Sequence, residues 1–315
     1  MIPALWLHQA QERIAAHIQR TPLFYDERRK LYLKWENHQV TGSFKIRGAL
    51  NKVLSLEAWE RSRGLVAASA GNHGQGVALA AKLVGCPATV FVPESAVPAK
   101  VRAIQALGAK VIFVPGGYGE AEVAGIRYAR ENQITWISPY NDGQVIAGQA
   151  TLALEMLEQL PELREMPWLI PVGGGGLISG IGAALENTPG GHKIIGVQST
   201  ASPFFHAIFH RGSQAGVQEL PSIADGLAGP VEEGSVTVPL VQRLVDDILL
   251  VDEDDIVEAI RDAWFTYGER IEGSAAVTLA AILSGKIAAR PAVLILSGGN
   301  IQPEWHRELV DGLHG

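Results

Sequence analysis

Short apolar runs alternate along the chain with longer segments in which apolar residues recur at helical spacing. The helical segments that this spacing predicts cover residues 4–20, 74–84, 99–107, 119–132 and 142–160. The apolar runs predict strands that begin at Leu31, Leu65, Ala88, Lys110, Thr135, Trp168, Lys193 and Ala292. Runs that are apolar almost throughout suit parallel strands covered by helices on both faces. The pattern therefore predicts an α/β fold with a parallel-sheet core.

The length of 315 residues exceeds one ordinary domain, and no low-complexity linker or repeat divides the chain. We therefore expect two lobes that are interleaved in the sequence. The net charge of -7 and the lack of a basic stripe argue against nucleic acid or an anionic membrane as a partner. Cys86 is the only cysteine, and the first residues lack a signal-peptide layout, so we expect a cytoplasmic protein. No apolar stretch is long enough to span a bilayer.

An acidic run at residues 252–255 precedes a segment of helical spacing. It allows two interpretations, a metal site or the start of a helix. Carboxylates are favoured at a helix N-terminus because the exposed amides and the helix dipole attract them. We expect a helix start.

The segment TGSFKIRGA, residues 41–49, contains a lysine among small and apolar residues. A lysine held in an apolar pocket has a lowered pKa, so its neutral amine can attack a carbonyl and form a Schiff base. Lys45 is the candidate for this role. The alternative is a solvated lysine at the end of a helix.

The segment SAGNHGQG, residues 69–76, follows a predicted strand and precedes a predicted helix. Consecutive amides at such a turn suit a carboxylate or a phosphate. Asn72 adds an amide that can donate a hydrogen bond to a phenolate-type oxygen. His73 is an acid, a ligand or a loop residue, and we assign it mainly a backbone role.

Two glycine-rich turns follow predicted strands. GGGGL, Gly173 to Leu177, allows several amides to converge on one phosphate, although a turn used only for packing is the alternative. It matches neither the dinucleotide fingerprint nor the Walker pattern, which argues against a nicotinamide oxidoreductase. In LSGGN, residues 296–300, the Ser297 hydroxyl could bond a heterocyclic nitrogen, or the segment is simply a turn.

Taken together, these motifs resemble the fold-type II pyridoxal-phosphate enzymes, and within them the threonine/serine dehydratase and serine racemase family. The resemblance covers nearly the whole chain. Its segments are TPL at Thr21, KWENHQVTGSFKIRGAL at residues 34–50, SAGNHGQGVA at 69–78, VGGGGL at 172–177, IADGLA at 223–228 and LSGGN at 296–300.

The resemblance implies a two-lobed architecture like that of the tryptophan synthase β subunit. The large lobe would comprise residues 1–50 and 142–315, and residues 51–141 would form a smaller α/β lobe inserted in it. The cofactor, pyridoxal 5'-phosphate, would lie in the cleft between them, and a homodimer is implied.

The resemblance also implies roles for individual residues. Lys45 would carry the cofactor as an imine and remove the substrate α-proton, with Phe44 packed on the pyridine ring. The remaining cofactor contacts would be Asn72 to the phenolic oxygen, Ser297 to the ring nitrogen, and Gly173, Gly174, Gly175, Gly176 and Leu177 to the phosphate. The implied substrate contacts are Ser69, Ala70, Gly71, Asn72 and His73, together with Gly226 and Glu272, the last of which could equally mark a helix start.

Two departures from the family pattern have consequences. Serine racemases carry a serine at the position of Ala70, where it acts on the ring face opposite the lysine, so racemase activity should be low. Many relatives have an acidic residue near Gln198 that binds a divalent cation, whereas this segment, residues 198–202, carries no charge. We expect no metal site there.

The sequence thus predicts dehydration and deamination of a small hydroxy-amino acid, L-threonine or L-serine, to a 2-oxo acid and ammonia. The alternatives are another β-elimination, such as hydroxyaspartate dehydration, serine racemisation, and a pyridoxal-phosphate-binding regulatory protein with little turnover.

Overall fold

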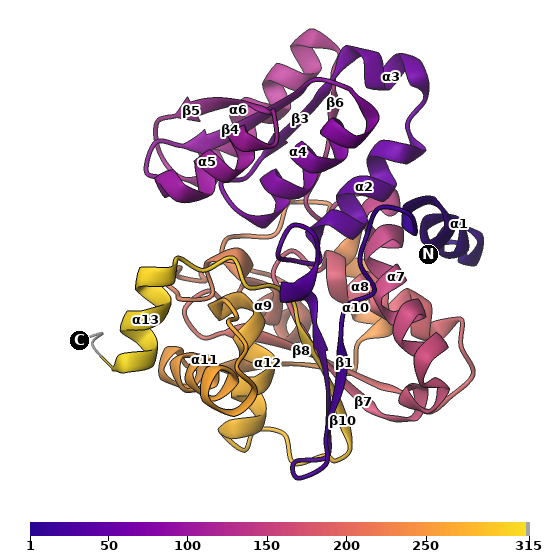
Figure 1. Ribbon diagram of the computed structural model, residues 1–315, viewed down its shortest axis with the longest axis vertical. Helices are drawn as coiled ribbons and strands as arrows, with labels where there is room; N and C mark the ends of the chain where they lie inside the picture. Colours follow the sequence, from indigo (N-terminus) through magenta and orange to yellow (C-terminus); the bar gives the residue numbers. More distant parts are fainter. Residues whose placement is uncertain (313–315) are drawn as a thin grey trace.

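Two separate β-sheets organise the protein, whose computed structural model describes residues 1–312 (Figure 1). The larger sheet has six strands in the order β1-β2-β10-β7-β8-β9, and the smaller has four in the order β5-β4-β3-β6. The strands of the larger sheet are β1 Leu23–Asp26, β2 Leu31–Trp35, β7 Pro167–Pro171, β8 Lys193–Ser199, β9 Asp247–Val251 and β10 Ala292–Leu296. Those of the smaller sheet are β3 Leu65–Ala68, β4 Ala88–Pro93, β5 Lys110–Val114 and β6 Thr135–Trp136.

The larger sheet is parallel except for β1, which pairs with β2 in the antiparallel sense. Successive side chains of a strand point to opposite faces. In β10, Val293 and Ile295 therefore enter the hydrophobic cluster that includes α7, α8 and α10, whereas Leu294 and Leu296 enter the cluster of α11 and α12. Both faces of the sheet are covered, as its apolar strands require.

The smaller sheet is parallel throughout. Helices α4 and α5 pack on one face and α6 packs on the other. The first seven helices are α1 Ala4–Ile14, α2 Lys45–Ser55, α3 Ala58–Arg63, α4 Asn72–Val84, α5 Pro98–Ala106, α6 Tyr118–Asn132 and α7 Gly143–Gln159. They are followed by α8 Gly176–Glu186, α9 Phe204–Arg211, α10 Thr237–Leu244, α11 Glu253–Tyr267, α12 Gly273–Leu283 and α13 Pro303–Asp311. Short 3-10 helices cover Glu36–His38, Pro161–Glu165 and Asp225–Leu227.

The α/β fold with a parallel-sheet core confirms the prediction from the sequence, and each of the eight predicted strands is present. Strands β1 and β9 were not predicted. The first helix is shorter than expected, because α1 ends at Ile14 instead of near residue 20. Beyond α1, the side chain of Gln39 makes two hydrogen bonds to the backbone of Gln19. It accepts from the N–H of Gln19 at 2.9 Å and donates to the carbonyl of the same residue at 2.8 Å. These contacts hold the chain extended toward β1. The acidic run is a helix start, as predicted, since α11 begins at Glu253.

Three helices approach each other through glycine. A Cβ on Gly48 of α2 would collide with α7, one on Gly148 of α7 would collide with the backbone of α2, and one on Gly180 of α8 would collide with α7. Helix α7 therefore packs tightly against both α2 and α8. Since α2 begins at Lys45 and α8 begins after the glycine loop, this packing sets the distance between those two helix starts.

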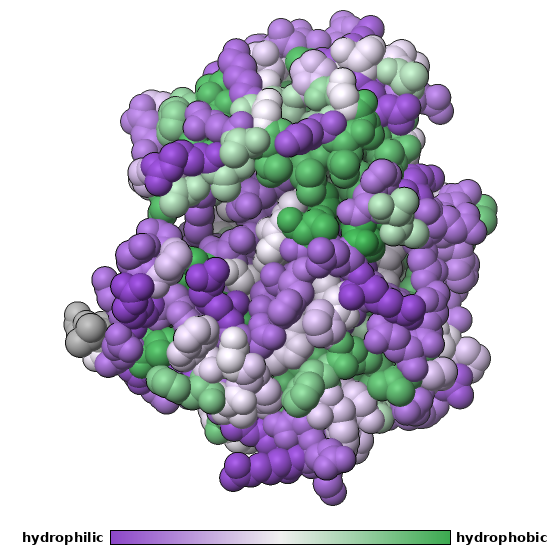
Figure 2. All heavy atoms as spheres, in the orientation of Figure 1, coloured by the Kyte–Doolittle hydropathy of each residue, from purple (hydrophilic) through white to green (hydrophobic). Residues whose placement is uncertain are grey.

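The space-filling view shows a hydrophobic area over α2 and α4 and a hollow between the parts that contain the two sheets (Figure 2). Leu83, in α4, is one of the exposed apolar side chains. Among residues 1–312, no helix has the length and apolar character needed to cross a membrane.

Candidate functional site

The candidate residues meet where strands of the two sheets end and helices begin. The loop after β3 leads into α4 at Asn72, the glycine loop connects β7 to α8, and Ser297 follows β10. Lys45 is the first residue of α2. Ligands of parallel α/β sheets bind at this edge, where strands present their carboxyl ends and helices their N-termini.

Lys45 lies between the two sheets and is only half-buried as a residue, but its amine is in a poorly solvated position. The Nζ atom donates to the carbonyl of Pro139 at 3.1 Å and lies 5.2 Å from the centre of the Phe44 ring. Burial lowers the pKa of Lys45 from 10.5 to about 8, an effect that the carboxylate of Glu272 partly opposes. The neutral amine needed for attack on a carbonyl is therefore accessible near neutral pH.

Asn72 is held by two side chains from the large-sheet part of the protein. Its Nδ2 donates to Oε1 of Glu272 at 2.6 Å, and its Oδ1 accepts from Nδ2 of Asn300 at 2.6 Å. Asn300 also donates to the carbonyl of Thr41 at 2.8 Å. Glu272 is buried and is the residue that precedes α12, so it marks the start of that helix. Burial, reinforced by Asp225, raises the pKa of Glu272 from 4.5 to about 7.

The loop before α4 supplies a turn of backbone amides. The N–H of Gly71 donates to Oγ of Ser69 at 3.1 Å, and Ser69, Ala70 and Gly71 are half-buried. Asn72 and His73 are the first residues of α4, two positions before the expected helix start. The Nε2 of His73 bonds the carbonyl of Ile137 at 2.8 Å, and burial lowers its pKa to about 3. His73 is therefore neutral and anchors the start of α4.

The glycine loop has space only for glycine at several positions. Gly175 has a left-handed φ of +84° and its Cβ would strike the Phe205 ring, while a Cβ on Gly174 would strike the Tyr140 ring. The carbonyl of Gly174 accepts from Oγ1 of Thr237 at 2.7 Å. The loop ends at the N-terminus of α8, where Gly176 and Leu177 begin the helix and their amides lack helical acceptors.

The other predicted residues take up distinct positions. Ser297 is buried, and its carbonyl accepts from the N–H of Phe44 at 3.0 Å. Gly226 lies near Gly173 but is exposed, and its N–H donates to Oγ of Ser274 at 2.9 Å.

Gln198, near which many relatives have an acidic cation ligand, is buried. Its Oε1 accepts from the N–H of His206 at 2.9 Å. Within residues 1–312, no group of three or more His, Cys, Asp or Glu side chains is arranged to hold a metal ion.

A cavity of about 480 Å³ opens beside this group. It includes Asn300, Gly273, Lys100 and Asp225 among its lining residues. Lys100 comes from α5 and pairs with Asp225 at 2.7 Å, so this ion pair crosses between the two parts of the protein. The cavity has the size and the mixed lining expected for a small polar ligand.

Sequence reasoning did not identify Asn300, Pro139 or Tyr140 as members of this group. Asn300 stands in the LSGGN motif, which was a usable signal. Pro139 and Tyr140 lie in the connection between β6 and α7 and had no such signal. They belong to the group because the carbonyl of Pro139 accepts from the Lys45 amine and the ring of Tyr140 lies against Gly174 of the glycine loop.

Comparison with known proteins is consistent with this geometry. A family model described as pyridoxal-phosphate dependent enzyme matches residues 14–298. The L-threonine ammonia-lyase of Thermotoga maritima is 40% identical over 302 residues, which cover 94% of this chain and 75% of that protein. Maize serine racemase superposes with a TM-score of 0.88 at 32% identity, covering 98% of each chain. Threonine deaminase isoform 2 of Solanum lycopersicum gives 0.87 at 31% identity, covering 98% of this chain and 94% of that one. The chain belongs to the pyridoxal-phosphate dependent enzymes.

Proposed function

We propose that the protein dehydrates and deaminates a small hydroxy-amino acid, with L-threonine as the first substrate to test, and that Lys45 is the residue that binds the cofactor covalently. The chain fits pyridoxal phosphate because positions 174 to 176 of the glycine loop have no room for a Cβ and the loop ends at the N-terminus of α8, whose free amides suit a phosphate. The observation that carries the proposal is the position of the Lys45 amine, which donates to the carbonyl of Pro139 at 3.1 Å, next to Tyr140, whose ring lies against Gly174; burial there lowers the pKa of Lys45 to about 8.

The cofactor, when bound, supplies an electron sink that weakens the bonds at the α-carbon of an amino acid. In our proposal the Lys45 amine first holds the cofactor and then, once released, takes the α-proton of the substrate. Ser297 would offer a neutral hydroxyl to the ring nitrogen, Phe44 would pack on the ring, and Asn72, which donates to Glu272 in this structure, would turn its amide to the phenolic oxygen. A neutral partner at the ring nitrogen favours elimination over transamination.

The substrate carboxylate would bind to the amides of the loop from Ser69 to His73 at the start of α4. The neutral state of His73 suits a backbone role there, since its ring is committed to the Ile137 carbonyl. Glu272 and Gly226 would also contact the substrate, and Glu272 would exchange its bond to Asn72 for one to the ligand. These assignments rest on the family resemblance, and the backbone amides at the start of α4 supply suitable donors.

The choice of L-threonine is supported by the relatives. The Thermotoga maritima protein is named L-threonine ammonia-lyase, and a protein from Sinorhizobium fredii that is 38% identical over 316 residues is named putative threonine dehydratase. L-Serine differs by one methyl group, and pockets discriminate weakly on one methylene, by about 1–3 kcal/mol. We therefore include L-serine among the substrates.

Serine racemisation is the second candidate, because of the likeness to maize serine racemase. It needs a proton donor and acceptor on the ring face opposite the lysine. Ala70 carries no such group. This residue is the specific observation that favours elimination over racemisation.

We also propose a homodimer, a cytoplasmic location, and a division into lobes at residues 50–51 and 141–142. The homodimer follows from the family resemblance, and the hydrophobic area over α2 and α4 is compatible with it (Figure 2). The lobe division is supported by the strand membership of the four-stranded sheet, which lies within residues 65–136.

The test is a substrate panel for the holoenzyme: L-threonine, L-serine, 3-hydroxyaspartate and the D-isomers, with ammonia and 2-oxo acid measured together. Equal amounts of ammonia and 2-oxobutanoate from L-threonine are expected, with less pyruvate from L-serine. Oxaloacetate from hydroxyaspartate at a higher kcat/KM would replace the proposal by the alternative elimination. Exchange of serine enantiomers without ammonia would replace it by racemisation.

A further inference from the structure

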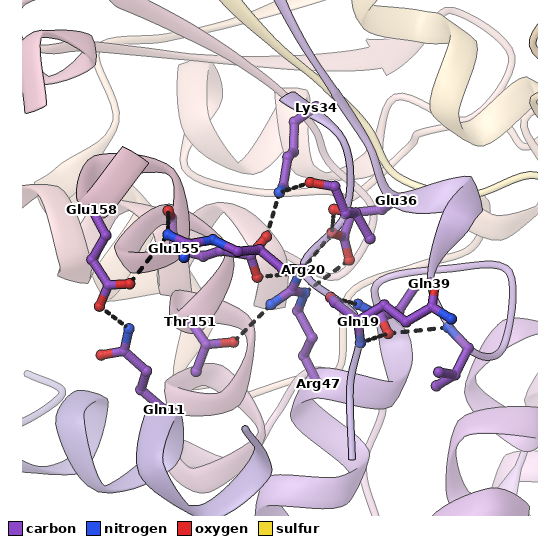
Figure 3. A network of polar contacts seen from close by, with 12 residues as sticks. Gln11, Gln19, Arg20, Lys34, Glu36, Gln39, Arg47, Thr151, Glu155 and Glu158 are labelled. Atoms are coloured by element: carbon purple, nitrogen blue, oxygen red, sulfur yellow. Dashed lines mark hydrogen bonds and ion pairs between the residues drawn. The ribbon is translucent and has the colours of Figure 1, made fainter. Parts of the chain in front are cut away.

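Four charged side chains are buried together beneath the first turns of α2, at positions that the cofactor chemistry does not use (Figure 3). They are Lys34, Glu36, Arg47 and Glu155, of which the first three belong to the KWEN and FKIR segments. Three of these residues are 0% exposed and Glu155 is 8% exposed. Charged residues are almost never buried this deeply unless paired.

The network is complete in its hydrogen bonds and balanced in charge. Arg47 donates from Nε and Nη2 to the two carboxylate oxygens of Glu36, each at 2.8 Å, and from Nη2 to Glu155 at 2.9 Å. Lys34 pairs with the other oxygen of Glu155 and donates to the carbonyl of Thr21 at 2.7 Å. Two cations face two carboxylates, which is the arrangement that makes such burial tolerable.

Glu36 and Arg47 keep their charges in the folded protein. For Glu36, burial acts to raise the pKa, but Arg47 outweighs it and the pKa is held below its usual value. Arg47 keeps its proton despite burial because Glu36 and Glu155 raise its pKa.

A buried ion network is weak evidence for stability, since apolar replacements of equal volume are often as stable. Its distinctive property is geometric. A bidentate arginine fixes both the distance and the plane of its partner.

Arg47 fixes the helix that begins with Lys45. The two residues are two positions apart, about 200° around an α-helix, so they point in nearly opposite directions. The Lys45 side chain reaches toward Pro139, whereas that of Arg47 enters the core against the 3-10 helix after β2 and against α7 (Figure 3). The same turn is held on its other side by main-chain contacts, from Phe44 to Ser297 at 3.0 Å and between Ser43 and Gly298.

We propose that Arg47 and Glu36 are positioning residues for Lys45. Their bidentate pair holds the first turn of α2 at a fixed rotation, so the Lys45 amine is presented to the cofactor without rearrangement. Lys34 and Glu155 complete the charge balance. The inference rests on the proposed role of Lys45, and on no particular amino-acid substrate.

The test compares charge-balanced variants of the full-length protein. Glu36→Gln combined with Arg47→Gln removes the pair without leaving a net buried charge. Arg47→Lys keeps the positive charge but cannot make the bidentate contact with Glu36. This single variant tests the positioning role if the double variant does not fold. The control is Arg29→Gln with Asp262→Asn, because Arg29 also makes a bidentate pair, at 2.6 and 2.7 Å, but joins the turn after β1 to α11.

The readouts are the thermal midpoint, the rate at which added pyridoxal phosphate attaches to Lys45 in the stripped protein, and kcat and KM with L-threonine. Attachment is followed by borohydride trapping and mass spectrometry. Both Arg47 variants should attach the cofactor roughly tenfold or more slowly, with a matching fall in kcat and little change in KM. The control should keep both rates whatever its thermal midpoint.

Two results would overturn the inference. One is attachment at the wild-type rate in the folded Arg47 variants, and the other is an equal loss of rate in the Arg29 control. If the wild type attaches the cofactor at Lys45 but deaminates no amino acid, the proposed function fails. The comparison of attachment rates still decides the positioning role.

Discussion

Asn72 donates a hydrogen bond of 2.6 Å to Glu272, and this contact joins the start of α4 in the small-sheet part to the start of α12 in the large-sheet part. Two hundred positions separate the residues in the sequence. The contact holds a buried carboxyl group near enough to Lys45 for each group to affect the pKa of the other. The titrations of Glu272 and Lys45 are therefore coupled.

The contribution of Glu272 to the stability of the cofactor-free protein should fall between about pH 4.5 and pH 7. The pKa of Glu272 is raised from 4.5 to about 7, so this carboxyl group binds more protons in the folded than in the unfolded state in this window. Its contribution to the free energy of unfolding therefore decreases as pH rises through the window, by up to roughly 3 kcal/mol, whereas the lowered pKa of His73 acts in the opposite direction in both proteins. Glu272→Gln should lose that contribution. Urea unfolding of both proteins at pH 5 and pH 8 checks this, and an identical pH dependence would contradict it.

Covalent attachment of pyridoxal phosphate to the stripped protein should accelerate with pH and level off above about pH 8. The reactive form of Lys45 is the neutral amine, and burial lowers its pKa to about 8. Glu272→Gln removes a carboxylate that raises this pKa, so its midpoint should move to lower pH. Stopped-flow absorbance gives the profile. A midpoint near 10.5, the ordinary lysine value, would mean that the amine is solvated.

Gly174→Ala should weaken cofactor binding, because the new Cβ would overlap the Tyr140 ring. Such overpacking costs about 1–3 kcal/mol. Adding Tyr140→Ala should restore much of the affinity, which identifies the ring as the cause. Gly119→Ala is the control, since a Cβ there meets nothing within 4 Å in α6. Equilibrium titration with pyridoxal phosphate measures the affinities, and failure of the second change to compensate would exclude a purely steric effect.

Ala70→Ser should increase racemisation relative to elimination. A serine hydroxyl at this half-buried position gives the pocket a proton donor and acceptor that the wild type lacks. Chiral chromatography of L-serine incubations measures D-serine against pyruvate, with Ala70→Gly as a control that adds no hydroxyl. If the wild type already forms D-serine as fast as the serine variant, another group performs this transfer.

Local patterns in the sequence predict the sheet cores because buried parallel strands are apolar along their whole length. The runs at Leu65 and Ala292 are of this kind. Strand β1 cannot be predicted from an apolar run, because it is a short edge strand in which Phe24 and Tyr25 are exposed. The end of α1 escapes it because a distant side chain, Gln39, holds the chain extended there.

In the candidate site, too, some residues can be predicted from local motifs and others cannot. Lys45 and the glycine loop stand in local motifs, so their chemistry is visible in the sequence. The partners of Asn72 are Glu272 and Asn300, which reach it only when the two sheets are packed together. The same holds for the contact of Arg47 with Glu155, which depends on the close approach of α2 and α7. Pairings over such separations are set by tertiary packing.

The central claim is that Lys45 carries pyridoxal phosphate in an enzyme that deaminates a hydroxy-amino acid. The most direct measurement is the absorption spectrum of the wild type and of Lys45→Ala, each reconstituted with pyridoxal phosphate, with 2-oxobutanoate measured in the same cuvette after addition of L-threonine. We predict that the variant lacks the absorbance of the covalently bound cofactor and that only the wild type forms 2-oxobutanoate. Unchanged absorbance and turnover in the variant, or no bound cofactor in the wild type, would contradict the account.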